Sequence, residues 1–239
     1  MTALPTRKDE AWRYSDLAAV GSVWPVATER LVVAAGTSLA RRVVQDDEGT
    51  RVDTLSVTVE AGATFALDVV TMGSGFGRVA VDVTLMRAAH FVLGGVILGR
   101  GEATREIVTT VTHAEPNATS RQVVRTVLDD RATGSYLGKV AVARDAQKSD
   151  AVQSVKALLL SRTATANAKP ELEIFADDVK CAHGATVGEL NRDALFYMAS
   201  RGIGADEARA LLIEAFIGDA LAGSPDLAER AVAWLRRTA

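Results

Sequence analysis

The residues with the clearest chemical potential lie in one segment, ELEIFADDVKCAHGATVG, at residues 171–188. This segment contains the only cysteine of the chain, Cys181, and His183 follows two residues later. Residues i and i+2 of a β-strand point to the same face, so a strand here presents a thiol and an imidazole side by side. Both groups are good ligands for iron or zinc. A complete metal site needs more ligands, from elsewhere in the fold or from a partner.

Other interpretations of the same residues remain. From their spacing alone, a buried cysteine and a structural histidine are the favoured interpretation of Cys181 and His183, and the metal-site interpretation stays open. A hydrolytic cysteine enzyme is disfavoured, because its nucleophile and base usually meet through the fold and not at a spacing of two.

Asp177 and Asp178 are adjacent and face opposite ways on a strand, which argues against an acid/base pair. The glycine cluster at 73–77 lacks the Lys-Ser/Thr of a P-loop and predicts a turn. No catalytic residue and no nucleotide site are therefore expected.

Composition excludes several classes of protein. The 239 residues are 48% hydrophobic and 24% charged, as in a globular protein, and the 5% aromatic content predicts a core of Val, Leu, Ile and Ala. A net charge of −3 gives no footprint for nucleic acid. A single cysteine excludes an intramolecular disulfide. The charged N-terminal segment does not resemble a signal peptide, and no long apolar run predicts a membrane helix, so a cytoplasmic location is expected.

Three regions differ in pattern: residues 1–30, a short N-terminal segment; residues 31–188, which read as β; and residues 189–239, which read as helical. Alternating apolar and polar residues predict strands at 54–60, 64–70, 78–85, 90–98, 106–113, 121–128 and 135–142. Many short strands at this spacing suit a sandwich, a barrel or a β-solenoid, and periodicity alone does not choose among them. No internal repeat is obvious.

The C-terminal region predicts three helices. Asn191 is the expected N-cap of the first, at 192–200, and Ser224 followed by Pro225 is a strong start for the third. The second starts near Gly204, and its predicted apolar stripe consists of Ala208, Leu211, Leu212, Ala215 and Phe216.

Several stretches resemble the SufB/SufD family of the SUF iron–sulfur cluster assembly system, and its SufD branch in particular. They are PTRKDEAWRYSDL at 5–17, HAEPNATS at 113–120, GKVAVARDAQKSDAVQSVKALLLS at 138–161, and PELEIFADDVKCAHGATVG at 170–188, which continues into LFYMASRGI at 195–203 and EARALLIEAF at 207–216. The single cysteine favours the SufD branch over the SufB branch. The chain is much shorter than the long SufD forms.

The resemblance implies a mainly β fold: a right-handed parallel β-helix core with a C-terminal helical region and a short N-terminal helical segment. It also implies a scaffold subunit, not an enzyme, which supports cluster assembly with a SufB-type subunit and a SufC-type ATPase. SufB would pair through the β-helix, and the isolated chain would form a homodimer through residues 170–188. The ATPase would bind the C-terminal helices; the alternative is that these helices only cap the end of the β-helix.

The family's SufD histidine maps onto His183. The resemblance therefore implies that His183 and Cys181 lie at the partner interface as metal ligands for a transient iron–sulfur cluster or iron. A second function stays open, that of a purely architectural adaptor in the same complex that contributes no ligand. A carbohydrate-active β-helix enzyme would need clustered carboxylates on strands, where this chain offers mostly Thr, Val and Ala.

Overall fold

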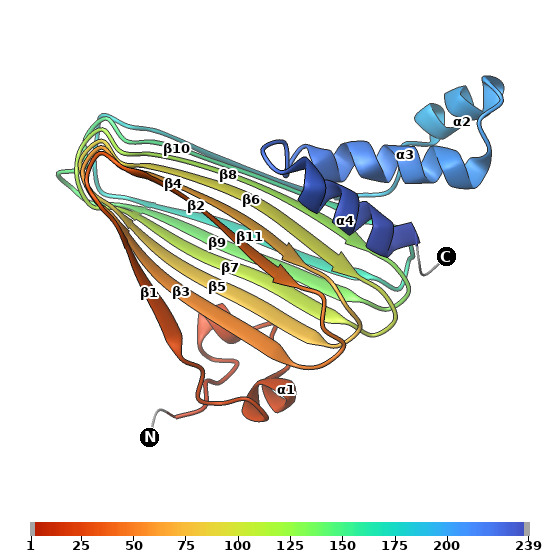
Figure 1. The fold of residues 1–239 in the computed structure, drawn as a ribbon, viewed down its shortest axis with the longest axis horizontal. Helices are drawn as coiled ribbons and strands as arrows, with labels where there is room; N and C mark the ends of the chain where they lie inside the picture. Colours follow the sequence, from red (N-terminus) through yellow and green to blue (C-terminus); the bar gives the residue numbers. More distant parts are fainter. Residues whose placement is uncertain (1–2, 237–239) are drawn as a thin grey trace.

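The structure, a computed structural model, describes residues 3–236; residues 1–2 and 237–239, the outer ends of the predicted regions 1–30 and 189–239, lie outside the described residues. Strands alternate along the chain between two sheets, in which all neighbouring strands are parallel (Figure 1). The odd sheet contains β1 (Thr28–Val33), β3 (Arg51–Val59), β5 (Phe76–Leu85), β7 (Thr104–His113), β9 (Thr133–Val142) and β11 (Thr165–Ile174). The even sheet contains β2 (Ser38–Gln45), β4 (Thr64–Thr71), β6 (His90–Gly99), β8 (Thr119–Leu128), β10 (Asp150–Leu159) and β12 (Lys180–Gly188). The helices are η1 (Glu10–Trp12), α1 (Leu17–Gly21), α2 (Arg192–Ser200), α3 (Ala205–Gly218) and α4 (Pro225–Arg236).

This arrangement confirms the parallel β-helix and excludes the sandwich and the barrel. Each turn contributes one strand to each sheet, but the turns differ in length. Thr28 pairs with Thr54, 26 positions later, whereas Thr133 pairs with Thr165, 32 positions later. Because the spacing drifts, the sequence contains no fixed period, which is why no repeat is visible in it.

Alternate residues of each strand point into the space between the two sheets and form the core. Val, Leu, Ile and Ala dominate it, as the composition predicts. Phe65 of β4 and Phe91 of β6 stack there with ring centroids 5.7 Å apart. Each fully buried Val or Leu side chain contributes about 1.5 to 3 kcal/mol to folding.

The N-terminal segment covers the outer face of the odd sheet, below the strands in Figure 1. Arg78 of β5 and Glu106 of β7 are register partners that point outward, and their buried side chains form an ion pair at 2.7 Å. The Ser15 hydroxyl donates to the same Glu106 oxygen at 2.7 Å, and the Trp12 ring centroid lies 3.8 Å from the Arg78 guanidinium carbon. Trp12 is therefore an anchor of this segment.

The helices α3 and α4 cover the outer face of the even sheet (Figure 1). The Nε of Arg125, on β8, donates to the Asp219 carboxylate at 3.0 Å, and Arg42 of β2 donates to Asp226 at 2.7 Å. These helices therefore lie on the side of the β-helix and do not cap its end. The apolar contact between them and the sheet includes Val70, Val96, Leu98, Val127, Ile213, Ile217, Leu227, Ala231 and Leu235.

The predicted apolar stripe of α3 is wrong in part. Leu211 and Ala215 are exposed, whereas Ile213 and Ile217 are buried against the sheet. The predicted Ala208 is buried as well. Apolar residues occur almost all round this helix, so their spacing does not select the packed face.

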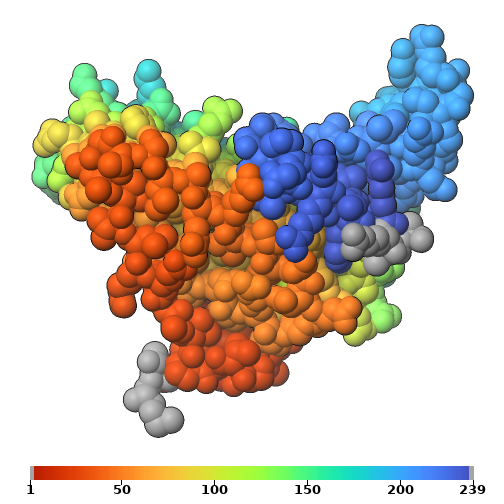
Figure 2. Space-filling view, viewed as in Figure 1, coloured from red at the N-terminus to blue at the C-terminus, as the bar shows by residue number. Residues whose placement is uncertain are grey.

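The helix α2 stands apart from both sheets (Figures 1 and 2). The Asn191 side chain accepts a hydrogen bond from the Ala194 backbone N–H at 3.0 Å, which confirms the predicted N-cap. None of the residues of α2 is buried. Among residues 3–236, the structure has no helix with the length and apolar character needed to span a bilayer.

His113 is an exception in the apolar interior. It lies at the end of β7, in register with Leu85 and Val142, and is fully buried. Its Nε2 atom lies 2.9 Å from the Ser120 hydroxyl oxygen. Burial lowers the pKa of His113 to about 4, from an ordinary value of 6.5, because the charged form loses its hydration. His113 is therefore a neutral, structural residue.

Acidification should destabilise the fold through His113. In the unfolded chain His113 takes up a proton near pH 6.5, but in the folded chain it stays neutral until the pH reaches about 4. The unfolded state therefore binds more protons in this window, and stability that is present above pH 6.5 is lost as the pH falls to 4. The loss is on the order of 2 to 3 kcal/mol.

Urea unfolding at pH 7 and pH 4.5 measures this loss. The control is His113→Leu, which introduces the residue that β5 has at the paired position 85. The free energy of unfolding should fall less on acidification in this variant than in the wild type. If the free energy of unfolding falls equally in the two proteins, carboxylates and not His113 cause the pH dependence.

Candidate functional site

Cys181 and His183 lie on β12, the last strand of the even sheet. They pair with Ala151 and Gln153 of β10, both of which are buried and point between the sheets. In-register neighbours in a parallel sheet point the same way, so Cys181 and His183 share the inner face of β12. This is the common face that their spacing predicts.

The last turn of the β-helix has no strand over it among the described residues, because β11 and β12 are the end members of their sheets. Its inner side chains are therefore open to solvent. His183 is exposed and Cys181 is half-buried. The inner side of this turn also carries apolar side chains, with Val187 of β12 50% exposed and Ile174 of β11 39% exposed. We call this surface, formed by β11, β12 and the turn between them, the open end.

The first turn of the β-helix is different. Glu29 of β1 and Arg41 of β2 pair in register with the inward-facing Leu55 and Leu67, so both point to the inner side. Their side chains form an ion pair at 3.0 Å across the gap between the sheets. The first turn thus carries a polar bridge over the core, whereas the open end carries apolar groups, one thiol and one imidazole.

The surroundings of Cys181 reduce its reactivity. Its side chain packs against the edge of the core, and this burial raises the pKa of the thiol, so the thiolate is disfavoured at neutral pH. The exposed imidazole of His183 is the more accessible ligand. In the described part of the chain no three His, Cys, Asp or Glu side chains are grouped to hold a metal ion.

The other segments considered from the sequence have structural roles. Asp177 and Asp178 lie in the turn between β11 and β12, where the Asp178 backbone N–H donates to the Gln147 side chain at 2.9 Å. Of the glycine cluster at 73–77, Gly73 and Gly75 lie in the turn between β4 and β5, as predicted, and Gly77 lies in β5. A Cβ atom on Gly73 would lie 2.3 Å from the Arg105 guanidinium, so this residue must be small.

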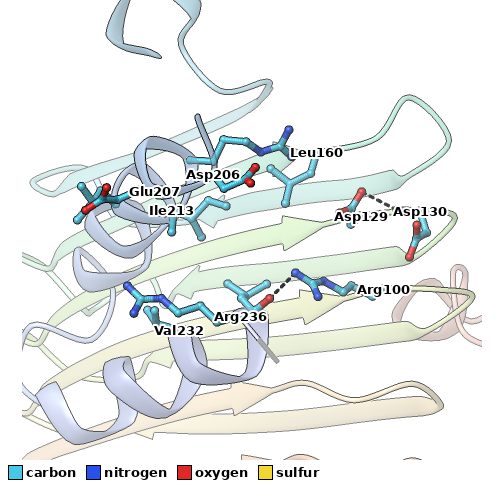
Figure 3. A pocket seen from close by; sticks show the side chains of 13 residues that line it. Arg100, Asp129, Asp130, Leu160, Asp206, Glu207, Ile213, Val232 and Arg236 are labelled. Carbon is cyan, nitrogen blue, oxygen red and sulfur yellow. Dashed lines mark hydrogen bonds between the residues drawn. The ribbon is translucent and has the colours of Figure 1, made fainter. Parts of the chain in front are cut away.

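A cavity of about 620 Å³ lies between α3, α4 and the turns that follow β6 and β8 (Figure 3). Leu160 and Ile213 contribute apolar surface, and Arg100 donates a hydrogen bond to the backbone carbonyl of Leu235 at its wall. Neither Cys181 nor His183 lines this cavity. Its charged lining is of mixed sign and includes Arg100, Arg209, Arg236, Asp129, Asp130 and Asp206.

Sequence reasoning missed a buried polar cluster next to the open end. Gln122, Tyr136 and Gln153 are each at most 1% exposed and are linked by hydrogen bonds inside the core. Gln153 falls in the same alternating phase as the apolar Ala151 and Val155 of its strand. This position in the alternation could have predicted that Gln153 is buried, because a polar residue in the apolar phase of a strand points inward.

Comparisons with known proteins agree with this geometry. Residues 18–216 match the family model described as SUF system FeS cluster assembly, SufBD core domain. The chain is 40% identical over 121 residues to an iron-sulfur cluster assembly SufBD family protein of Synechocystis, a match covering 51% of this chain and 27% of that protein. It is 39% identical over 117 residues to the iron-sulfur cluster assembly protein SufD of Escherichia coli, a match covering 48% of this chain and 28% of that protein. It is 33% identical over 117 residues to the iron-sulfur cluster assembly protein SufD of Bacillus subtilis, a match covering 49% of this chain and 27% of that protein.

The matched segments span little more than a quarter of the length of these relatives. The family model, in contrast, covers most of this chain, from α1 through the whole β-helix into α3. The parallel β-helix, the family match and the two SufD relatives agree: the chain belongs to the SufB/SufD family of the SUF system and is of the SufD type.

Proposed function

We propose that this chain is a SufD-type scaffold subunit that supports iron–sulfur cluster assembly and has no active site of its own. The observation that carries the proposal is the open end, an uncovered apolar surface with His183 and Cys181 on its inner face, in a chain of this family. The relatives of this chain that are named iron-sulfur cluster assembly proteins support the same role.

A SufB-type subunit would cover the open end. The edge strands β11 and β12 each have one side without a neighbouring strand in the described chain, and such edges readily accept another strand. The apolar side chains beside them would be buried by the same contact. In the absence of SufB, a second copy of this chain would occupy the surface and form a homodimer.

The partner would also complete the metal site. A neutral imidazole is a competent iron ligand, and His183 would offer one of its ring nitrogens to iron or a nascent cluster held between the subunits. Here the cluster is the cargo of the complex. The alternative, an architectural adaptor, uses the same surface for pairing but assigns no ligand to His183.

The SufC-type ATPase would bind at α2 and the adjacent start of α3. Phe196 and Tyr197 of α2 are 77% and 58% exposed, although aromatic side chains of this size are commonly buried. The charged cavity with Asp206 and Arg209 in its lining begins directly beyond α2. Exposed aromatic residues beside mixed charges are the composition of a protein-binding surface, and aromatic residues are enriched among those that dominate binding energy.

His183→Ala should separate the scaffold from the adaptor. The side chain is exposed at the open end, so its removal should leave folding and pairing with the SufB-type subunit intact. Cluster yield per intact complex, measured by absorbance after anaerobic reconstitution, should fall by about tenfold or more. Cys181→Ser should have a milder effect, because the thiol is held protonated by burial.

His90→Ala is the matched control, because His90 is also exposed but lies on β6, away from the last turn. Its cluster yield should equal that of the wild type. If His183→Ala also matches the wild type while the complex still forms, His183 is not a ligand and the adaptor is the correct function.

Substitutions on α2 test the docking of the ATPase. Deleting residues 190–239 would also uncover the apolar face of the even sheet, so point changes are the better test. Phe196→Ala combined with Tyr197→Ala should weaken binding of the SufC-type subunit by about 30-fold, the effect of losing one hot spot, in isothermal titration calorimetry. Val32→Ala, which changes an exposed apolar residue on β1, should leave the affinity unchanged. Wild-type affinity in the α2 variant would exclude this helix from the interface.

A further inference from the structure

One column of side chains runs along the interior of the even sheet to His183. The strand register stacks Leu67, Leu93, Gln122, Gln153 and His183 on successive strands from β4 to β12. Adjacent members lie about one strand spacing, ~4.8 Å, apart along the backbone. The column is apolar on β4 and β6 and polar on β8, β10 and β12; on β2 it starts with Arg41, the register partner of Leu67.

In the hydrogen bonds of this cluster the Gln153 amide directs its nitrogen at Tyr136, and the Gln122 amide keeps its own nitrogen without a partner among the described residues. The Gln122 Oε1 atom accepts from the Thr109 hydroxyl at 2.9 Å and from the Tyr136 hydroxyl at 3.1 Å. Since the Tyr136 proton is used there, its oxygen accepts from Gln153 Nε2 at 3.4 Å. The Gln153 nitrogen is therefore directed toward Tyr136, and its carbonyl oxygen is the atom left over.

That oxygen is buried and has no hydrogen-bond partner among the described residues. A buried acceptor without a donor is unfavourable, because it has lost its water and gained nothing in return. The next member of the column is His183, whose imidazole always carries at least one N–H donor. It is the ionisable side chain paired in register with Gln153 on β12.

We propose that Gln153 is a positioning residue for His183. Its Oε1 atom accepts the N–H of one imidazole nitrogen, which fixes the tautomer of the ring. The other ring nitrogen then carries the lone pair and points out of the open end. Histidines that bind metals are commonly held in this way by a carbonyl or carboxylate acceptor behind them. The use of this nitrogen for iron rests on the proposed function, but the proposed hydrogen bond from His183 to Gln153 does not.

The tautomer of His183 is the direct readout. The full chain with ¹⁵N-labelled histidine is examined at pH 8 by long-range ¹H–¹⁵N correlation, with the His183 signals assigned from His183→Ala. In the wild type the two ring nitrogens should have widely separated shifts, those of a single tautomer. In Gln153→Leu, which introduces the leucine found at positions 67 and 93 of the same column, the two shifts should move toward each other as both tautomers become populated.

Gln45→Leu is the matched control, because Gln45 is as buried as Gln153 but lies on β2 and takes no part in the hydrogen bonds of Gln122, Tyr136 and Gln153. It should lower stability and leave the His183 shifts unchanged. Gln153→Glu keeps an acceptor oxygen and should restore the single tautomer. A mixture of tautomers in the wild type, unchanged shifts in Gln153→Leu, or equal changes in both Leu variants would each overturn the proposal.

A second measurement separates this inference from the proposed function. Iron bound per complex with the SufB-type subunit should fall about tenfold in Gln153→Leu. One outcome is that the His183 tautomer changes in Gln153→Leu but the amount of bound iron changes in neither Gln153→Leu nor His183→Ala. The positioning role of Gln153 is then correct and the ligand role of His183 is wrong. The opposite outcome is that the amount of bound iron falls in His183→Ala but the His183 tautomer is unchanged in Gln153→Leu. The ligand role of His183 is then correct and the positioning role of Gln153 is wrong.

Discussion

In a parallel β-helix each turn covers the turn before it, so the first and last turns each have one side that the chain itself leaves uncovered. Both the unpaired backbone groups of the end strands and the ends of the apolar core are then exposed. In this chain the inner sides of the first and last turns carry different side chains. The ion pair between Glu29 and Arg41 bridges the first turn, whereas the last turn keeps Val187 and His183 exposed and Cys181 half-buried. The last turn is the less polar of the two, although the inward-facing Leu39 of the first turn is also 38% exposed.

The outer faces of the two sheets are occupied by the chain's own flanking segments. The N-terminal segment is held on the odd sheet by the buried contact of Arg78, Glu106 and Ser15, and removing one partner of such a pair leaves a buried charge without compensation. The helices α3 and α4 cover the even sheet through a continuous apolar contact. The open end and the exposed aromatic residues of α2 have no such cover from the described part of the chain.

Much of this architecture is readable from the sequence. Alternating Val and Thr predicts the middle strands to within two or three residues, and Asn191 predicts the start of α2 through its capping oxygen. The choice of a β-helix came from the resemblance, because the drifting turn length hides the repeat. The packed face of α3 was not predictable, since apolar residues surround that helix. The spacing of Cys181 and His183 predicts their common face, but only the register shows that Gln153 lies behind His183.

The central claim is that the open end is where a second chain joins this one. Amide hydrogen exchange of the full chain tests it most directly, because backbone amides of an unpaired edge become protected when a strand is added. The chain is measured alone, at a concentration low enough to keep it monomeric, and then with the SufB-type subunit. The account predicts slower exchange in β12 and β11 on complex formation, with β1 and β2 at the other end unchanged. Unchanged exchange in β12, or protection confined to β1 and β2, would contradict it.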